Sequence, residues 1–547
     1  MPVFSWTHLA VAMLVIAGGP SSASAQRFLS DDPLWADPDH IDMPLPEARE
    51  AASKRMGPFE FLRRTFGVPG EYTEPALNVN TVEGVPNSSW YTNRHYRHPM
   101  SRVELTRGPN VEPGPARGAP WRVVDLVEDA SLPRAVIEDT TGRRFRILFD
   151  AANHPEMATG AAMISSRLLH ALGYNVPQHW LRRISAEQLR ASSDSVRQSD
   201  VDSVLAMTTR EDRTYRALVT RIPDAVRRIG PFQFHGTRPD DANDVFPHER
   251  RRELRGLRVM AAWIHHSKIR PRHTLDVGVQ VGGRQFVRHY LTDLHLTLGS
   301  GGAAPKPPWS GHEYVLELEQ VLERVATLGL SGGDWAETDP PNWPALGHFG
   351  SGGFEPTDWR PEWPNPAFQR SDSADAFWAA KQVRQFSRSE LEAIVTTADY
   401  SSSAVSNYVV LSLLQRRNAI ARAYLSWGGG LDRFAVRDGR LEFADFRARY
   451  GMASDTTRRT ITWRVFHNGR NRVGRRLTRK TSSRESIRLP PTRPPFLRVR
   501  IETPGVGDTR VFLRRTRPST SSATAATIPR ETEYEVVGIE RSAADED

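Results

Sequence analysis

Three segments near residue 120 alternate apolar and polar positions, and this alternation predicts a set of short strands. They span 121–127, 134–139 and 143–150, with turn residues at Ala130–Pro133 and Thr141-Gly142. A period of two residues is typical of strands that bury one face of a sheet. Another strand is predicted over 216–224.

The period becomes helical between these strands, over 157–172. Ile164, Leu168 and Leu172 recur four residues apart, and Gly173 and Pro177 follow them. Glycine just after the last helical turn, with proline beyond it, is a typical helix end. The segment therefore predicts a strand, a helix and a tight turn in direct succession.

Beyond residue 225 the helical period dominates. We predict helices at 248–265, 312–327, 373–386, 387–397 and 404–426. Ser387 and Glu390 form a capping box at the start of one of them. The pattern thus predicts a core over 116–427, with a β-rich lobe up to about residue 225 and a helical lobe after it.

Alternation returns at the C-terminal end and predicts a small β-sandwich over 456–542. Its strands alternate apolar residues with Arg, Thr or Glu, which is typical of a sheet with one solvated face. We interpret 428–455 as a linker and 543–547 as an acidic tail. The predicted fold class is α+β.

The first 25 residues have the features of an export signal. Ala10–Ala17 is an apolar run, and Ala23-Ser24-Ala25 is a small-residue cleavage site. This run is too short to cross a bilayer, so we expect cleavage after Ala25, a periplasmic or secreted product and no transmembrane anchor. Residues 26–115 are rich in Pro, Asp and Asn and predict an extension that wraps a neighbouring domain.

Composition narrows the chemistry that the chain can perform. Its 547 residues include no cysteine, which excludes disulfides, thiol catalysis and cysteine-ligated zinc. The formal net charge is +9. If this charge serves a partner of an exported protein, an acidic envelope polymer or lipid suits it better than nucleic acid. The favoured interpretation is a solvated basic surface without a dedicated partner.

Two segments carry a resemblance to known proteins. The first is Arg143–Pro177, RRFRILFDAANHPEMATGAAMISSRLLHALGYNVP; the second is Gly256–Asp276, GLRVMAAWIHHSKIRPRHTLD, followed by FVRHYLTDLHLTLG up to Gly299. They resemble the atypical kinases of the HipA and CotH type, and more closely an uncharacterised family of exported bacterial proteins. The resemblance implies a two-lobed protein-kinase-like core.

The resemblance also implies where the groups that hold the phosphates would lie. A kinase holds them with a strand lysine and a helix glutamate that pairs with it. The lysine position falls at Leu148 and the glutamate position at Ala162. Losing both together is coherent, because either group alone would be a costly unpaired buried charge.

The remaining catalytic positions are also altered. Ser267 or Lys268 falls at the catalytic aspartate and His273 at the asparagine, whereas Asp293 matches the metal-binding aspartate. Without the lysine, the base and the asparagine, the electrostatic stabilisation that phosphoryl transfer requires is missing. We therefore expect an inactive pseudokinase, without a cofactor, that acts as a scaffold or regulator in the bacterial envelope. Its partner would be an active kinase-like relative or another protein.

Two alternatives use other features of the same region. An unconventional phosphotransferase would bind ATP and Mg²⁺, keep Asp293 for the metal and recruit Lys268 or a histidine. A metal- or glycan-binding module would use Asp293 and His273, or tryptophans of the 329–370 passage. The metal candidates belong to a cluster of His265, His266, His273, His289, His295, Asp276 and Asp293.

The segment 237–256 concentrates acids and arginines. Its members include Asp240, Asp241, His248, Glu249, Arg251, Arg252 and Arg255. Charges gathered at this density ahead of a predicted helix indicate a buried network of ion pairs that holds the helical lobe together.

Overall fold

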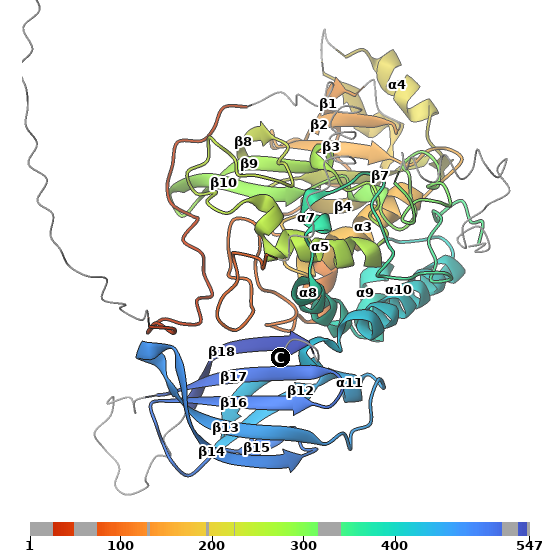
Figure 1. Ribbon diagram of the computed structural model, residues 1–547. Coiled ribbons are helices and arrows are strands. Elements are labelled where there is room, and N and C mark those ends of the chain that lie inside the picture. Colours follow the sequence, from red (N-terminus) through yellow and green to blue (C-terminus); the bar gives the residue numbers. More distant parts are fainter. Residues whose placement is uncertain are drawn as a thin grey trace, which may run out of the picture.

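The computed structural model describes residues 26–48, 74–127, 132–192, 196–223, 225–314, 341–516 and 534–543 (Figure 1). The predicted signal segment 1–25, most of the predicted helix 312–327 and all but the first residue of the acidic tail lie outside these residues. Within them, no helix is long and apolar enough to cross a membrane. The architecture is mixed α+β.

A seven-stranded sheet forms the first part of the core. The strands run in the order β4-β7-β3-β2-β1-β5, with β6 paired to β7. The four strands predicted in this region, β1 to β3 and β7, are confirmed. The members are β1 (Trp121–Leu126), β2 (Arg134–Glu138), β3 (Arg144–Phe149), β4 (Gln178–Ser185), β5 (Leu189–Ala191), β6 (Arg210–Glu211) and β7 (Thr214–Arg221).

Each face of this sheet packs against a helix, because alternate residues of a strand point to opposite sides. Leu148 of β3 joins α3 (Met157–Ala171) in the main hydrophobic core of the molecule. Its neighbour Phe149 belongs to a second hydrophobic cluster with α4 (Gln198–Ala206). The predicted helix 157–172 is confirmed as α3.

A second sheet follows, where we had expected helices to dominate, and this part of the prediction is wrong. Strands β8 (Ala225–Gly230), β9 (Thr274–Val281) and β10 (Arg284–Leu291) form a three-stranded antiparallel sheet. The hairpin between β9 and β10 turns at Gly282 and Gly283, whose φ angles are +59° and +79°. Glycine adopts such angles without steric cost, so this turn closes a two-residue loop.

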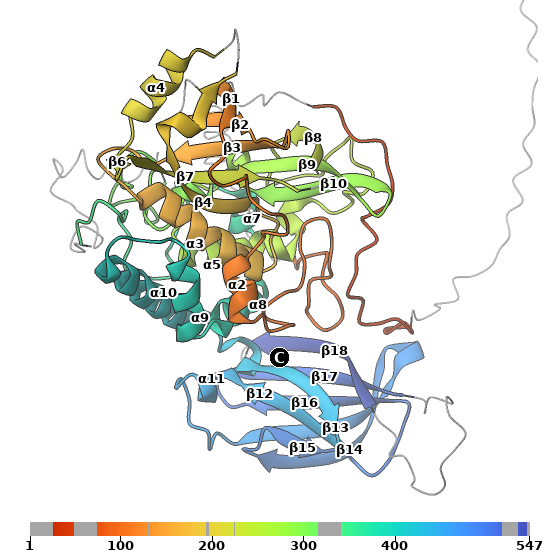
Figure 2. The same ribbon diagram turned by 180° about the vertical axis from the view of Figure 1, so that it is seen from behind.

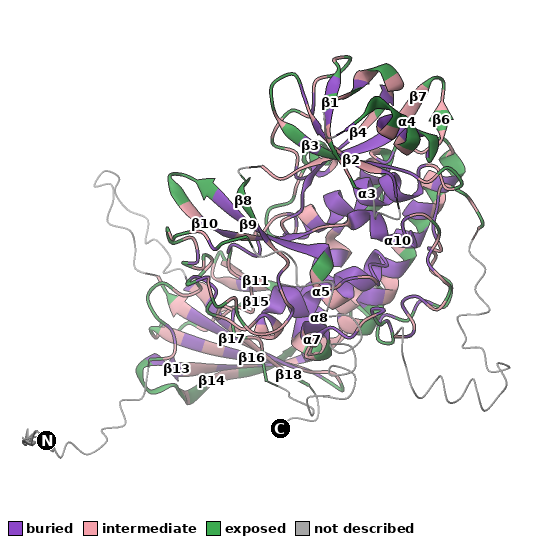
Figure 3. Ribbon diagram, turned by 90° about the horizontal axis from the view of Figure 1, so that it is seen from above, coloured by how far each residue is buried: buried purple, intermediate pink, exposed green. Residues whose placement is uncertain are grey.

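The predicted helices after this sheet are largely confirmed. The α-helix at 248–265 begins only at Arg252, because Arg251 is extended with ψ of 126°. Ser387 caps α9 and forms the expected capping box with Glu390. The buried faces of these helices pack into the main hydrophobic core of the molecule (Figure 3). The helices are α5 (Arg252–Trp263), α7 (Pro366–Gln369), α8 (Ser373–Gln385), α9 (Arg388–Thr396) and α10 (Ser403–Tyr424).

The C-terminal strands gather at one end of the molecule, below the helices in Figures 1 and 2. A five-stranded antiparallel sheet has the order β14-β13-β16-β17-β18, and a three-stranded sheet has the order β11-β12-β15. One hydrophobic cluster contains residues of both sheets. The strands are β11 (Leu431–Arg437), β12 (Arg440–Asp445), β13 (Arg459–His467), β14 (Arg472–Ser482), β15 (Ser486–Arg488), β16 (Phe496–Thr503), β17 (Gly507–Arg515) and β18 (Tyr534–Ala543).

The predicted linker 428–455 is wrong, because β11 and β12 occupy much of it. These two strands pair through a turn at Asp438 and Gly439, both with positive φ. An Asp-Gly pair between apolar stretches is a strong hairpin signal. A short helix, α11 (Phe446–Arg449), then leads into the five-stranded sheet.

The N-terminal extension contacts both the core and the C-terminal strands. Phe28 is 2% exposed and inserts among Phe466, Phe496 and Phe512. A Cβ on Gly538 would lie 2.5 Å from the Phe28 ring, so the ring sits directly on the backbone of β18. Further along the extension, a short helix, α2 (Arg102–Arg107), packs against α3 and α9.

We expect Phe28→Ala to lower the free energy of unfolding of the C-terminal strands by about 3–5 kcal/mol, because it leaves a cavity among three phenylalanines. Denaturant titration followed by fluorescence or circular dichroism measures this change. The matched control is Leu29→Ala, since Leu29 is 59% exposed and its truncation should cost less than about 0.5 kcal/mol. Equal effects from the two substitutions would contradict this account of the extension.

Candidate functional site

The two positions that would hold a lysine and a glutamate lie in the apolar core. Leu148 is 7% exposed on β3, and Ala162 on α3 is fully buried. Both belong to the same hydrophobic cluster. The residues opposite Leu148 in the sheet are Arg134 of β2 and Leu218 of β7. No ionisable group therefore lies at either position.

The start of α3 is held by Asp150, the third residue of the Leu148-Phe149-Asp150 sequence. Its carboxylate accepts hydrogen bonds from the backbone N–H groups of Ala158 and Thr159, both at 2.9 Å, and from the Thr159 hydroxyl at 2.6 Å. Burial raises the pKa of Asp150, while these bonds and the charge of Arg216 lower it. Asp150 is thus a helix-capping group in this structure.

Ser267, at the predicted catalytic position, is bound to a carboxylate that comes from far along the chain. Its hydroxyl lies 2.6 Å from the Ser310 hydroxyl and 3.1 Å from Glu362 Oε1. The Glu362 backbone N–H also donates to the Ser267 carbonyl at 2.8 Å. Ser267, Ser310 and Glu362 are all at most 5% exposed. This arrangement closes the position to a substrate.

Lys306 lies beside this group and is fully buried. Its ammonium donates to the His265 carbonyl at 2.7 Å. Burial lowers the pKa of Lys306 to about 7; the charge of Glu362 opposes this change, and the charges of Lys268 and Arg416 reinforce it. Lys268 is less buried, and its ammonium donates to the Gly301 carbonyl at 3.3 Å. Sequence reasoning missed both Lys306 and Glu362.

The candidate metal residues His273 and Asp293 each have other neighbours among the described residues. His273 is buried, its Nδ1 contacts the Lys268 carbonyl, and burial holds its pKa well below the ordinary value. Asp293 is half-buried, and His295 lies 3.9 Å from its carboxylate. Across the described residues, no three histidine or carboxylate side chains come close enough to hold a metal ion.

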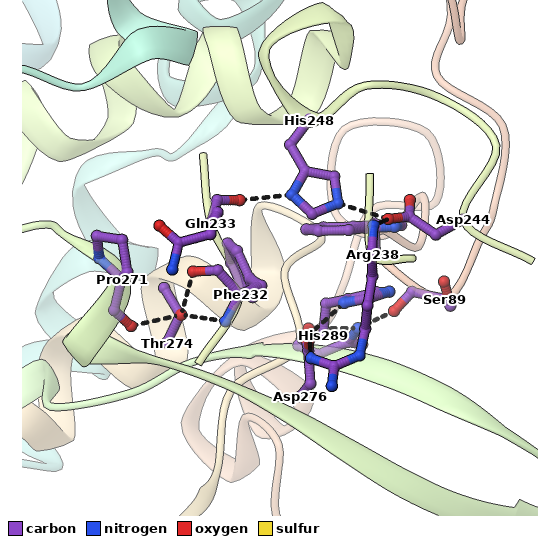
Figure 4. Close-up of polar contacts among 12 residues, drawn as sticks. Ser89, Phe232, Gln233, Arg238, Asp244, His248, Pro271, Thr274, Asp276 and His289 are labelled. Atoms are coloured by element: carbon purple, nitrogen blue, oxygen red, sulfur yellow. Dashed lines mark hydrogen bonds and ion pairs between the residues drawn. The ribbon is translucent and has the colours of Figure 1, made fainter. Parts of the chain in front are cut away.

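His289 of the histidine cluster and His248 of the charged segment 237–256 lie in one buried polar network (Figure 4). His289 Nδ1 donates to Asp276 at 2.7 Å, and Arg238 donates to the same carboxylate at 2.9 Å. His248 Nε2 donates to Asp244 at 2.6 Å, and its Nδ1 donates to the Gln233 carbonyl. Both ring nitrogens of His248 thus face oxygen acceptors.

Trp90 of the N-terminal extension joins the two halves of this network. Its ring is stacked on the His289 ring at 3.5 Å between centroids, and the Arg251 guanidinium lies 4.8 Å from the Trp90 ring. Arg251 also pairs with Asp244 at 3.1 Å. The predicted buried ion-pair network of 237–256 is confirmed, and it extends to residues that sequence reasoning did not include.

The tryptophans considered as a sugar platform are used in packing. Trp359 is 3% exposed and contacts Phe368, and Trp343 packs edge-on against Tyr408. The Arg270 guanidinium lies over the Trp363 ring. Trp335, the fourth tryptophan considered, lies outside the described residues.

A cavity of about 740 Å³ lies between the extension, α8, β11 and β18. Its main polar groups are already paired, because Lys381 binds Asp432 at 2.8 Å and the Tyr96 hydroxyl donates to the same carboxylate at 3.0 Å. Arg97 covers the Trp35 ring, with 3.3 Å between the guanidinium carbon and the ring centroid. These contacts leave little of the lining free to recognise a sugar.

Comparison of the chain with protein-family models, with curated proteins and with solved structures found no match.

Lys306 makes stability depend on pH. Its pKa in the folded protein, about 7, lies below the ordinary 10.5, so the unfolded chain binds more protons between these values. Stability should therefore rise with pH across this window, by at most about 1.4 kcal/mol per pH unit. Lys306→Met should remove this contribution from the unfolding free energies measured at several pH values. Lys480→Met, at an exposed position, should leave the slope unchanged, and a Lys306→Met slope equal to that of the unmodified protein would contradict the assignment.

Asp244 is the carboxylate on which the network most depends. Burial alone would raise its pKa, but His248 and Arg251 hold that pKa well below its usual range. Asp244→Asn keeps the shape and leaves Arg251 without its closest carboxylate, so we expect a loss of about 3 kcal/mol in unfolding free energy at neutral pH. Asp212→Asn, in an exposed turn, is the control. A loss no larger than that of the control would show that the network contributes little.

Proposed function

We propose that this chain is a kinase-fold protein that has lost phosphoryl transfer and acts as a scaffold or regulator in the bacterial envelope. The order of elements supports the kinase-like core. Three strands precede α3 and further strands follow it; then come α5, the loop with Ser267, the β9–β10 hairpin and Asp293. A kinase has its strand lysine, helix glutamate, catalytic loop and metal-binding aspartate in this order.

The absence of ionisable groups at Leu148 and Ala162 is the observation that carries the inactive assignment. Their burial in one apolar cluster leaves no room for a Lys–Glu pair without rebuilding the core. At the catalytic position, the hydroxyl of Ser267 is engaged by Ser310 and Glu362. A neutral serine hydroxyl that donates to Glu362 is a far weaker base than the aspartate it would replace, so it would not activate a substrate hydroxyl.

A regulatory role suits a fold that keeps its shape while lacking catalytic groups. The partner we propose is an active kinase-like relative or another envelope protein, and an acidic envelope polymer is the electrostatic alternative suggested by the charge of +9. The placement in the envelope follows from the export features of residues 1–25.

An unconventional phosphotransferase is the second candidate. The partial exposure of the Asp293 side chain favours it. Its carboxylate is 32% exposed, so a magnesium ion could reach one oxygen ligand of the kind it prefers. Lys268 or His273 would then have to replace the missing groups, but His273 is buried and bound to the Lys268 carbonyl.

The experiment that separates the two candidates is the thermal unfolding midpoint with millimolar ATP, measured with and without Mg²⁺ or Mn²⁺. A ligand that binds only the folded state raises this midpoint. For a pseudokinase we expect no increase that depends on the metal and no transfer of the γ-phosphate. An increase that requires the metal and disappears in Asp293→Ala would contradict the proposal and support the phosphotransferase.

A further inference from the structure

The charges of four arginines from separate parts of the chain act on the carboxylate of Asp293. They come from β2, β3, β8 and the turn before β9, and we call Arg134, Arg146, Arg228 and Arg272 the arginine patch. Burial raises the pKa of Asp293, and the charges of all four arginines act on it in the opposite direction. Arg134 is in turn influenced by Asp293, Arg146 and Arg272, so the four groups lie within electrostatic reach of one another.

The sheet itself brings two of these arginines beside Leu148. Arg134 is the direct partner of Leu148 on the neighbouring strand, and paired residues of adjacent strands share a face. Arg146 precedes Leu148 by two residues on β3 and therefore lies on this face as well. Sequence alternation alone could have revealed Arg146, but Arg134 required the register of β2 against β3.

The arginine patch carries more positive charge than its surroundings neutralise. Arg146, Arg228 and Arg272 are exposed, and their guanidinium groups make no hydrogen bond or ion pair with another described residue. Arg134 Nη2 donates to His295 Nε2 at 2.9 Å. An arginine nitrogen only donates, so the Nε2 atom that accepts from it carries no proton and the ring does not compensate the arginine charge. The patch thus opposes four guanidinium charges to the one carboxylate of Asp293.

We infer that the arginine patch binds a phosphate chain directly through its guanidinium groups, without a metal ion. Guanidinium groups bind phosphate oxygens with paired, charge-assisted hydrogen bonds. A metal ion would need at least one further oxygen ligand. The arginine charges that act on Asp293 would also repel a metal cation. The inference rests on the proposed function to the extent that the patch lies where a kinase-like core would hold phosphates.

The density of the patch favours phosphate over a carboxylate polymer. A di- or triphosphate concentrates several negative charges within a few bonds, whereas an acidic polysaccharide spreads single carboxylates along a chain. Arginine charges that all act on one carboxylate match the compact negative charge of a di- or triphosphate. Coulomb attraction falls with distance, so the compact ligand gains more from such a cluster.

The test is a titration of the purified full chain with tripolyphosphate in the presence of EDTA, by calorimetry or by the unfolding midpoint. We expect binding that weakens as salt is added, because exposed charges are screened. Arg146→Ala and Arg272→Ala should each weaken binding about tenfold. Arg190→Ala removes the same charge from the exposed side of β5 and should leave binding unchanged.

The arginine patch and a metal-dependent site predict opposite effects of Asp293→Asn on phosphate binding. For the arginine patch, removing the opposing negative charge should tighten metal-free binding several-fold. For a metal-dependent site, the same change should abolish binding. Asn is well tolerated here because the backbone of Asp293 is left-handed, with φ of 54°. An unchanged unfolding midpoint without ligand confirms that the variant is folded.

The source of the phosphates is resolved by comparing ATP, tripolyphosphate, AMP and orthophosphate. Tighter binding of ATP than of tripolyphosphate indicates a nucleotide, equal binding indicates recognition of the phosphate chain alone, and both support the inference. Binding of polygalacturonate in place of tripolyphosphate would overturn it. Absence of all anion binding would overturn the inference and leave the proposed function standing, whereas binding that requires Mg²⁺ would overturn both.

Discussion

Buried arginine–carboxylate pairs at the start of α5 join parts of the chain that are far apart in sequence. Arg252 and Arg255 bind Asp375 of α8 at 2.9 and 3.4 Å, and Arg251 binds Asp244. The backbone N–H of Arg252 also donates to the side-chain oxygen of Asn78 in the extension, at 2.8 Å. A buried ion pair adds little net stability over an apolar pair, but breaking one leaves an uncompensated charge. The network therefore selects one arrangement of the extension, the β9–β10 hairpin and the helices.

The candidate site separates its charges by depth. Its interior is neutral or internally paired, since Leu148 and Ala162 are apolar and Glu362 engages two serine hydroxyls. Its exterior carries the arginine patch around Asp293. An apolar interior and external arginines are thus compatible features. The interior holds no unpaired charge, and the arginines leave a strong positive field beside it.

Much of the fold followed from periodicity, and the failures have identifiable causes. Strands β1 to β3 and helices α3 and α8 to α10 have long, regular patterns that matched their predictions. The β9–β10 hairpin was missed because Asp276 and His289 interrupt its apolar positions, although they satisfy each other across the pair. Two glycines mark the turn of the β9–β10 hairpin, and an Asp-Gly pair marks the turn of the β11–β12 hairpin. At both places these turn residues indicate a hairpin more strongly than the helical period indicates a helix.

The sequence by itself determined the local elements, the capping of α9, the absence of thiol chemistry and the identity of the residues at the predicted catalytic positions. These properties depend on neighbouring residues and on side-chain type. Only the tertiary structure decided that Glu362 meets Ser267, that Trp90 lies between Arg251 and His289, and that the charges of four arginines act on Asp293. Such encounters join residues separated by long stretches of chain, and the packing of the whole core sets them, because no local period encodes which distant side chains will meet.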